Sequence, residues 1–138
     1  MGEVYRAHDD RLRRDVAIKV SSAQFTERFT REARTIASLN HTNICHLFDV
    51  GPNYLVMEYV EGADLAGPLD FEDALPILHQ LIDGIEAAHE KNVVHRGLKP
   101  ANIKVTPEDP LPNPIRLILP TNSFCSTNVG TGVQTNPF

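Results

Sequence analysis

The sequence is poor in the features that mark several common classes of protein. Its two cysteines, Cys45 and Cys125, lie far apart and lack the spacing of zinc ligands, so we expect neither a disulfide framework nor a zinc site. No apolar run approaches the length of a membrane span, and no charged and then apolar leader opens the chain. Thirteen Lys and Arg against eighteen Asp and Glu give a net charge of -5, which argues against nucleic-acid binding. We therefore expect a cytoplasmic protein with no nucleic acid and no membrane among its partners.

The chain contains enough apolar sequence for a core, but its composition changes along its length. Hydrophobic residues make up 41% of the 138 residues and charged residues 22%, which is typical of a folded domain. Periodic patterns extend to Val105, whereas residues 106–138 hold six of the ten prolines and no acidic residue after Asp109. We predict a domain over residues 1–105 and an irregular Pro/Ser/Thr/Asn-rich tail over residues 106–138, in which Ile115–Leu119 could form an isolated strand.

Two strands are predicted at the start of the chain. Gly2–His8 and Asp15–Val20 contain good strand formers, and the charged segment between them favours a hairpin. Ala17 and Lys19 share one face of the second strand, because side chains alternate along a strand. A small residue and a cation together suit a face that meets a ligand.

A helix is predicted over Thr26–Leu39, where apolar residues recur at helical spacing. Glu32 falls on the inward stripe of this helix, and a buried carboxylate needs a cationic or hydrogen-bonding partner. Lys19 is the nearest suitable candidate along the chain. The alternative is a boundary residue that reaches solvent, and the pattern favours neither.

An antiparallel strand pair and a long helix follow. Ile44–Val50 and Tyr54–Val60 are apolar runs separated by a turn sequence. The helix begins after a predicted N-cap at Asp70 and ends near Asn92. The following residues form its predicted apolar stripe, which we expect to be exposed for want of packing partners: Phe71, Ala74, Leu75, Leu78, Leu81, Ile82, Ile85 and Ala88.

Residues 93–105 read Val-Val-His-Arg-Gly-Leu-Lys-Pro-Ala-Asn-Ile-Lys-Val, a long pattern of fixed spacing. Together with Val16–Lys19 and Glu32, it resembles the catalytic loop and nucleotide-binding motifs of eukaryotic-type serine/threonine protein kinases, including their bacterial relatives. Gly2–Tyr5 is similar to the end of the glycine-rich loop, and Val56–Val60 to the strand that leads into the hinge. The resemblance implies an α+β fold with a small antiparallel-sheet N-lobe, one helix and the start of a helical C-lobe.

The resemblance also implies cofactors and residue roles. ATP and Mg2+ would be the cofactors, with a protein as substrate or partner. Lys19 would hold the α- and β-phosphates, Glu32 would pair with Lys19, and Lys99 would approach the transferring phosphate. Asn102 would be a magnesium ligand. Further nucleotide contacts would come from Gly2, Val4, Ala17, Met57, Glu58, Val60 and Asp64, although Asp64 could instead cap a helix or turn. His95 and Arg96 match framework positions that order the loop.

Three departures from the family pattern bear on activity. Gly97 stands where the family has its catalytic Asp, and glycine cannot accept a proton or orient a hydroxyl. No Asp-Phe-Gly motif follows Asn102, which leaves Glu108 and Asp109 as possible anionic ligands for magnesium. Gly2 is the last glycine of the phosphate loop, and the activation segment and the substrate-binding half have no counterpart, so we expect a truncated kinase domain.

These observations leave three hypotheses open. The chain could be a serine/threonine kinase family member with impaired catalysis. It could instead be a non-catalytic module that binds nucleotide or protein, or a truncated product without function.

Overall fold

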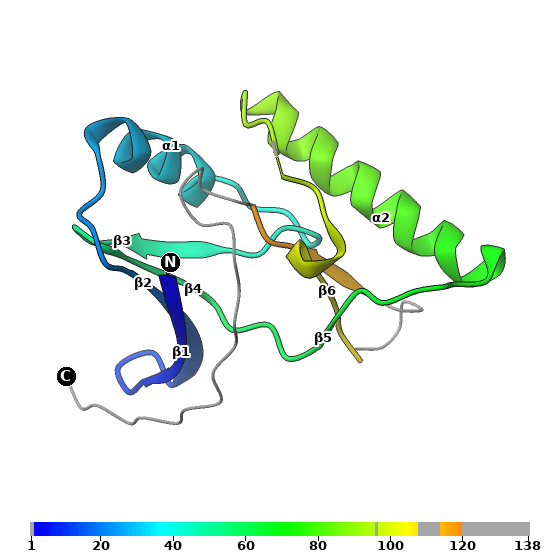
Figure 1. Cartoon of the computed structure of the whole chain (residues 1–138), viewed down its shortest axis with the longest axis horizontal. Coiled ribbons are helices and arrows are strands. Elements are labelled where there is room, and N and C mark those ends of the chain that lie inside the picture. The colour runs from blue at the N-terminus through cyan, green and yellow to red at the C-terminus, as the bar shows by residue number, and fades with distance from the viewer. Residues whose placement is uncertain (1, 96, 108–113, 120–138) are drawn as a thin grey trace. The chain divides into compact units, whose positions relative to one another are not determined.

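The computed structural model describes residues 2–95, 97–107 and 114–119, and these form two compact units (Figure 1). The first unit contains residues 2–37 and 46–59 of the described chain. The second contains residues 38–45 and the described residues from 60 to 119. No helix among the described residues has the length and apolarity needed to cross a membrane.

A four-stranded antiparallel sheet makes up most of the first unit. Its strands are β1 (Gly2–Asp9), β2 (Arg14–Ser21), β3 (Leu47–Val50) and β4 (Tyr54–Glu58), in the spatial order β1-β2-β4-β3. Both predicted strand pairs are therefore confirmed, although β3 is shorter than expected. Ile44 and Cys45, which were predicted to open that strand, lie outside it, and Ile44 bridges Leu117 instead.

The helix in the described part of the first unit is α1 (Glu27–Ala37), which confirms the predicted helix within a few residues. Thr26 caps its N-terminus, because Oγ1 of Thr26 accepts a hydrogen bond of 3.2 Å from the Phe29 N–H. Phe29, Ala33 and Ile36 are buried at three- and four-residue spacing. This stripe packs beside β3, and the Phe29 ring also packs against the tilted ring of Phe25, with ring centroids 4.0 Å apart.

The long helix of the second unit is α2 (Phe71–Glu90). Asp70 occupies the N-cap position as predicted, but its side chain makes no capping hydrogen bond. At the other end, Asn92 adopts a left-handed conformation with φ of 59°, which stops the helix where the sequence predicted.

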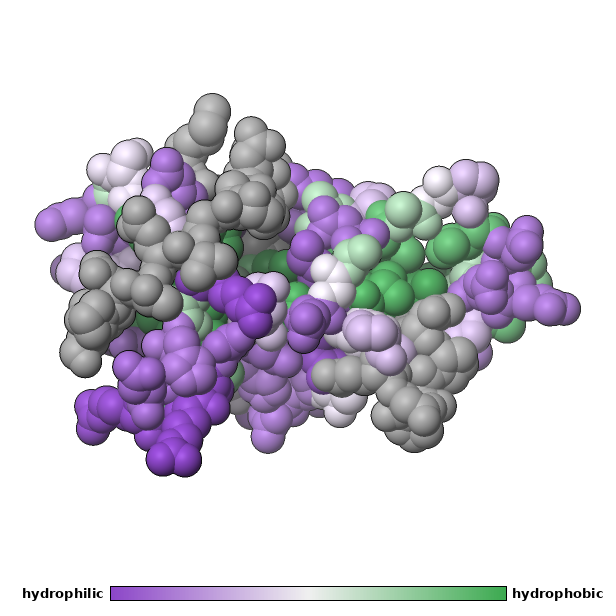
Figure 2. Space-filling model, turned by 90° about the horizontal axis from the view of Figure 1, so that it is seen from below, coloured by the Kyte–Doolittle hydropathy of each residue, from purple (hydrophilic) through white to green (hydrophobic). Residues whose placement is uncertain are grey.

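The buried face of α2 includes only Ala88 of the predicted apolar stripe. Its buried residues are Ile77, Gly84 and Ala88, and Gly84 allows a close approach to the backbone of Asn43. Four residues of the predicted stripe lie at the surface, as the sequence led us to expect: Phe71, Leu75, Leu78 and Ile82. Figure 2 shows hydrophobic surface in the part of the molecule that includes the N-terminal half of α2.

A small antiparallel sheet completes the second unit, in the order β5 (Ala63–Asp64), β6 (Ile103–Val105) and β7 (Ile115–Leu117). The short helix η1 (Pro100–Asn102) leads directly into β6. The prediction that the run from Ile115 forms an isolated strand is wrong. Ile115 and Leu117 alternate inward and are fully buried, so that β7 is part of the core.

The division of the chain after Val105 stays a prediction. Most of the predicted tail, residues 108–113 and 120–138, lies outside the described residues. Cys125 is among them, so the expected lack of a disulfide also stays a prediction, whereas Cys45 is buried.

Candidate active site

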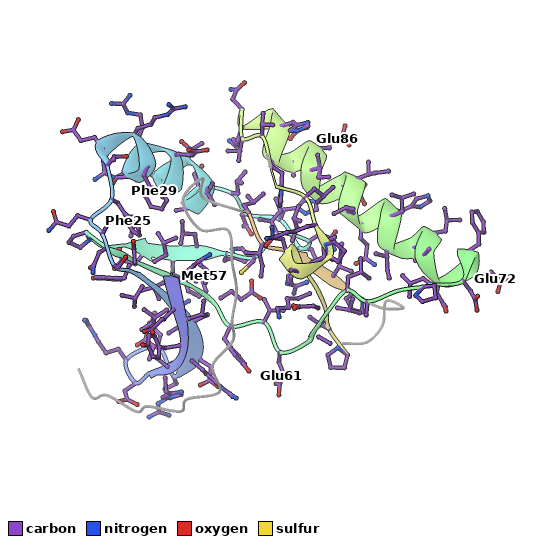
Figure 3. All side chains as sticks on the ribbon, viewed as in Figure 1. Phe25, Phe29, Met57, Glu61, Glu72 and Glu86 are labelled. Carbon is purple, nitrogen blue, oxygen red and sulfur yellow. The ribbon has the colours of Figure 1, made fainter. Side chains whose placement is uncertain are left out.

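The strands of the first unit bring several predicted nucleotide contacts onto neighbouring positions. Lys19 of β2 is directly opposite Val4 of β1, and Ala17 is opposite Met57 of β4, so each pair shares a face of the sheet. Ala17 is buried, whereas Lys19 and Met57 are partly exposed. Figure 3 shows Met57 on this sheet. Ala17 and Lys19 therefore give the face the small apolar residue and the cation that the sequence predicted. Gly2, at the start of β1, lies opposite Ser21.

Glu32 lies at the margin of the buried stripe of α1. Ala33 beside it is fully buried, while Glu32 itself is partly exposed. Lys19 is also partly exposed, so neither charge carries the full cost of burial. The pairing of Glu32 with Lys19 stays a prediction.

Glu58 at the end of β4 has a role that the sequence did not predict. Its carboxylate Oε2 accepts a hydrogen bond of 3.2 Å from the His46 N–H, and its own N–H donates to the His46 carbonyl at 2.8 Å. This reciprocal contact fixes the end of the strand that leads to Glu58 and Val60, two of the predicted nucleotide contacts.

In the second unit, His95 anchors the loop that contains Gly97. His95 is buried, and its Nε2–H donates to the Ile118 carbonyl at 3.1 Å while Nδ1 accepts the Gly97 N–H at 3.4 Å. These partners require the neutral Nε2–H tautomer. Burial lowers the pKa of His95, against a smaller opposing effect of the Ile118 carbonyl. The contacts agree with the framework role predicted for His95, whereas Arg96 lies outside the described residues.

Asn102 closes the same loop from its other end. Its Nδ2 donates to the Gly97 carbonyl at 2.8 Å, and its N–H donates to the Lys99 carbonyl at 2.9 Å. Its own carbonyl accepts the Ile118 N–H at 2.8 Å, so β6 and the residue after β7 hold it in place. Since Nδ2 of Asn102 donates its hydrogen bond within the loop, Oδ1 is the side-chain atom that could bind a cation.

Asp64 does not cap a helix or turn, and that interpretation is wrong. It lies in β5 directly opposite Lys104 of β6, and its carboxylate forms an ion pair with the Lys104 ammonium. The Asp64 side chain is 50% exposed, so it remains accessible. A contact of Asp64 with a ribose stays a prediction.

Sequence reasoning missed a polar network in the second unit. Oε1 of Gln80 on α2 accepts hydrogen bonds of 3.0 Å from both Asn43 Nδ2 and the Ile115 N–H. Asn43 is buried, and its Nδ2 also donates to the Ile115 carbonyl at 3.2 Å. The spacing offered a signal, because Gln80 lies three residues after Ile77 and four before Gly84, on the face that proves to be buried.

The described residues offer little to a magnesium ion. No three side chains among residues 2–95, 97–107 and 114–119 gather as a cluster of His, Cys, Asp or Glu able to hold a metal. The loop itself supplies one neutral amide oxygen, from Asn102. Glu108 and Asp109, the possible anionic ligands, lie outside the described part of the chain.

Comparison with known proteins decides the family. The model of the protein kinase domain matches residues 1–118. The chain belongs to the protein kinase family. It is 41% identical over 121 residues to the serine/threonine-protein kinase PrkC of Bacillus subtilis, covering 76% of this chain and 19% of PrkC. It is 41% identical over 128 residues to PknA of Mycobacterium tuberculosis, covering 78% of this chain and 30% of PknA.

Solved structures confirm the kinase-like α+β fold. Rad53 in complex with AMP-PNP is similar with a TM-score of 0.76 at 29% identity, over 91% of this chain and 36% of that one. The kinase domain of PknI from Mycobacterium tuberculosis gives a TM-score of 0.70 at 26% identity, over 86% of this chain and 54% of that one. The relatives PrkC and PknA are much longer than this chain, which spans less than a third of either.

Proposed function

We propose that this chain binds ATP but transfers phosphate poorly, as a kinase-family module with an incomplete catalytic loop. The observation that carries the proposal is the loop itself. Both backbone groups of Gly97 are bound, the N–H by His95 and the carbonyl by Asn102, yet no carboxylate stands at this position. The loop thus has its internal contacts without the group that would orient a hydroxyl or accept its proton.

Nucleotide binding is supported by the first unit. A triphosphate brings several negative charges, and Lys19 supplies a cation on the sheet face that Val4 shares. Ala17 and Met57 lie opposite one another on neighbouring strands, and their apolar side chains suit contact with an adenine ring. The relative Rad53 was solved with AMP-PNP, which supports a nucleotide as the ligand of this family member. Glu32 would orient Lys19, as in the family pattern.

The second unit would supply fewer contacts to the nucleotide than the first. Lys99 precedes η1 and is partly exposed, and the family pattern would have it approach the transferring phosphate. Val60 and Asp64 would contact the nucleoside. The described residues do not fit a protein-held magnesium site, because Asn102 is neutral and a hard cation needs anionic oxygen ligands. Any magnesium would have to be held mainly by the phosphates of the nucleotide.

Poor transfer follows from the missing groups. Phosphoryl transfer depends on positioning and charge neutralisation more than on a base, so Gly97 alone need not abolish it. A missing magnesium carboxylate is more serious, and residues 110–138 contain no Asp or Glu that could replace it. The alternative is a module that binds a protein partner without nucleotide.

A thermal-shift titration with ATP tests nucleotide binding. We expect ATP with Mg2+ to raise the Tm of the parent chain by several degrees at a ligand concentration about 100 times Kd. Lys19→Met should abolish most of the rise, since a phosphate-facing cation is lost with little change in volume. Lys91→Met, at the exposed end of α2, is the matched control and should behave like the parent. No rise in the parent, or an equal rise in Lys19→Met, would contradict the proposal.

A further inference from the structure

An arginine lies on the sheet face that carries the predicted nucleotide contacts of the first unit. Arg6 of β1 is directly opposite Ala17 of β2, and Ala17 is opposite Met57 of β4, so the three side chains share one face. The three strands are neighbours in the sheet (Figure 1). Arg6 therefore lies next to two proposed adenine contacts, although the proposed site gives it no role.

A carboxylate of the neighbouring strand holds the guanidinium of Arg6. Nε and Nη2 of Arg6 both donate to Oδ2 of Asp15, at 3.0 Å and 2.5 Å. The other carboxylate oxygen of Asp15, Oδ1, lies 2.8 Å from Nδ1 of His8, which is directly opposite Asp15 in the hairpin. Because two donors of the planar guanidinium are engaged at one carboxylate, the plane of the Arg6 side chain has a fixed orientation.

The same guanidinium covers the ring of Tyr59. Cζ of Arg6 lies 4.4 Å from the centroid of the Tyr59 ring, which is the geometry of a cation–π contact. Tyr59 follows β4 and stands between Glu58 and Val60, two of the predicted nucleotide contacts. Glu58 is held from the β3 side by its two hydrogen bonds with His46. Arg6 thus restrains the next residue along the chain from the β1 side.

We propose that Arg6 is a positioning residue for nucleotide binding, which packs over Tyr59 and so holds residues 58–60 in the conformation that contacts the adenine ring. The inference rests on the proposed function. Arg6 itself would touch no atom of the nucleotide, and Asp15 would act one step further away by orienting the guanidinium. A segment that is restrained beforehand loses less conformational freedom when the ligand binds, so the restraint lowers the Kd.

The alternative is a cluster that only stabilises the hairpin. The side chains of Arg6 and Asp15 are 50% and 34% exposed, and ion pairs with this exposure contribute little to the free energy of unfolding. A purely stabilising role predicts a lower Tm and no change in the affinity of the folded chain for ATP. A positioning role predicts a weaker affinity for ATP with little change in Tm. The two roles therefore differ in what they change.

Calorimetric titration of the full chain with ATP and Mg2+ tests the positioning role. We expect Arg6→Gln to raise the Kd about three- to five-fold, which corresponds to the loss of one exposed cation–π contact. Tyr59→Phe keeps the ring and should bind like the parent. Arg11→Gln, at an exposed position between β1 and β2, is the matched control and should also bind like the parent. Parent affinity in Arg6→Gln would overturn the inference.

A double-mutant cycle shows whether Arg6 acts through Tyr59. In a Tyr59→Phe background, Arg6→Gln should again raise the Kd about three- to five-fold, whereas in a Tyr59→Leu background it should have no further effect. Equal effects of Arg6→Gln in the two backgrounds would overturn the inference. A Tm that falls in Arg6→Gln while the Kd stays unchanged would show the purely stabilising role instead.

An NMR measurement without ligand separates this inference from the proposed function. The ring current of Tyr59 should shift the Arg6 Nε–H resonance, and the shift should disappear in Tyr59→Leu and persist in Tyr59→Phe. An Arg6 resonance that is the same in the parent and in Tyr59→Leu would show that the contact does not form, whether or not the chain binds ATP. A parent with the shifted resonance that fails to bind ATP would overturn the proposed function, and the role of Arg6 with it.

Discussion

One polar cluster in each unit shows two opposite uses of polar side chains. In the first unit they form exposed ion pairs on the β1–β2 hairpin, where Asp15 binds Arg6 at 2.5 Å and His8 at 2.8 Å. In the second unit they form buried hydrogen bonds between segments distant in sequence, as between Asn43 and Gln80. Exposed ion pairs contribute little to stability, whereas an unmade buried hydrogen bond is costly. The loop that contains Gly97 relies on the second kind of contact, because the buried His95 bonds to the Ile118 carbonyl 23 residues away.

The Gln80 network should show the largest effect. Gln80→Ala removes the acceptor of the Ile115 N–H, which belongs to a fully buried residue, so we expect the free energy of unfolding to fall by about 2 kcal/mol. Urea unfolding followed by circular dichroism measures this change. Gln24→Ala, at an exposed position of the first unit, is the control and should change stability by less than about 0.5 kcal/mol. Equal effects of the two substitutions would remove the contrast between the units.

His95 should give the second unit a characteristic dependence on pH. Its folded pKa lies below its ordinary value of 6.5, because burial disfavours the charged ring. The unfolded chain therefore binds the extra proton first as pH falls. The stability that His95 contributes is complete above pH 6.5 and is lost as pH falls from there toward the folded pKa.

Urea unfolding at several pH values between 5 and 8 checks this sign. We expect a smaller loss of stability on acidification in His95→Gln than in the parent. His89→Gln, at an exposed position near the end of α2, should keep the slope of the parent. A parent that becomes more stable between pH 7 and pH 5 would contradict the buried, neutral state of His95.

His8 in the first unit should respond with the opposite sign and the smallest effect. Its hydrogen bond with Asp15 raises the pKa of His8, so its contribution is complete below pH 6.5 and is lost as pH rises through the folded pKa. An NMR titration should show a lower His8 pKa in Asp15→Asn than in the parent. Asp10→Asn, whose carboxylate lies 3.8 Å from the His8 ring, should lower it less. A His8 pKa that Asp15→Asn leaves unchanged would show that the pair does not form in solution.

Local patterns predicted the elements of both units, but not the long-range contacts of the second. The β1–β2 hairpin and α1 follow from alternation and helical spacing between near neighbours. The pairing of β7 with β6 and the bond from Gln80 to Ile115 join residues that no local period connects. The sequence did not identify the buried face of α2, because apolar residues lie on more than one side of this helix and periodicity alone could not select the face toward the core.

In the candidate site, too, local motifs identified residues but not their distant contacts. The family motif identified Lys19, Gly97 and Asn102 by their spacing, while the partners of Gly97 and Asn102 became visible in the structure. The contact of His95 with the Ile118 carbonyl is an example, because Ile118 lies 23 residues further along the chain. The ion pair of Asp64 with Lys104 spans 40 residues, and the sequence instead suggested a local cap.

Phosphoryl transfer itself is the most direct test of the account. The parent chain and Gly97→Asp would be incubated with radiolabelled ATP, a general protein substrate, and magnesium or manganese, with Lys19→Met as the background. The account predicts no labelling above that background in either protein, because restoring the base leaves the magnesium carboxylate absent. Stoichiometric labelling by the parent that disappears in Lys19→Met would contradict it and show a working kinase.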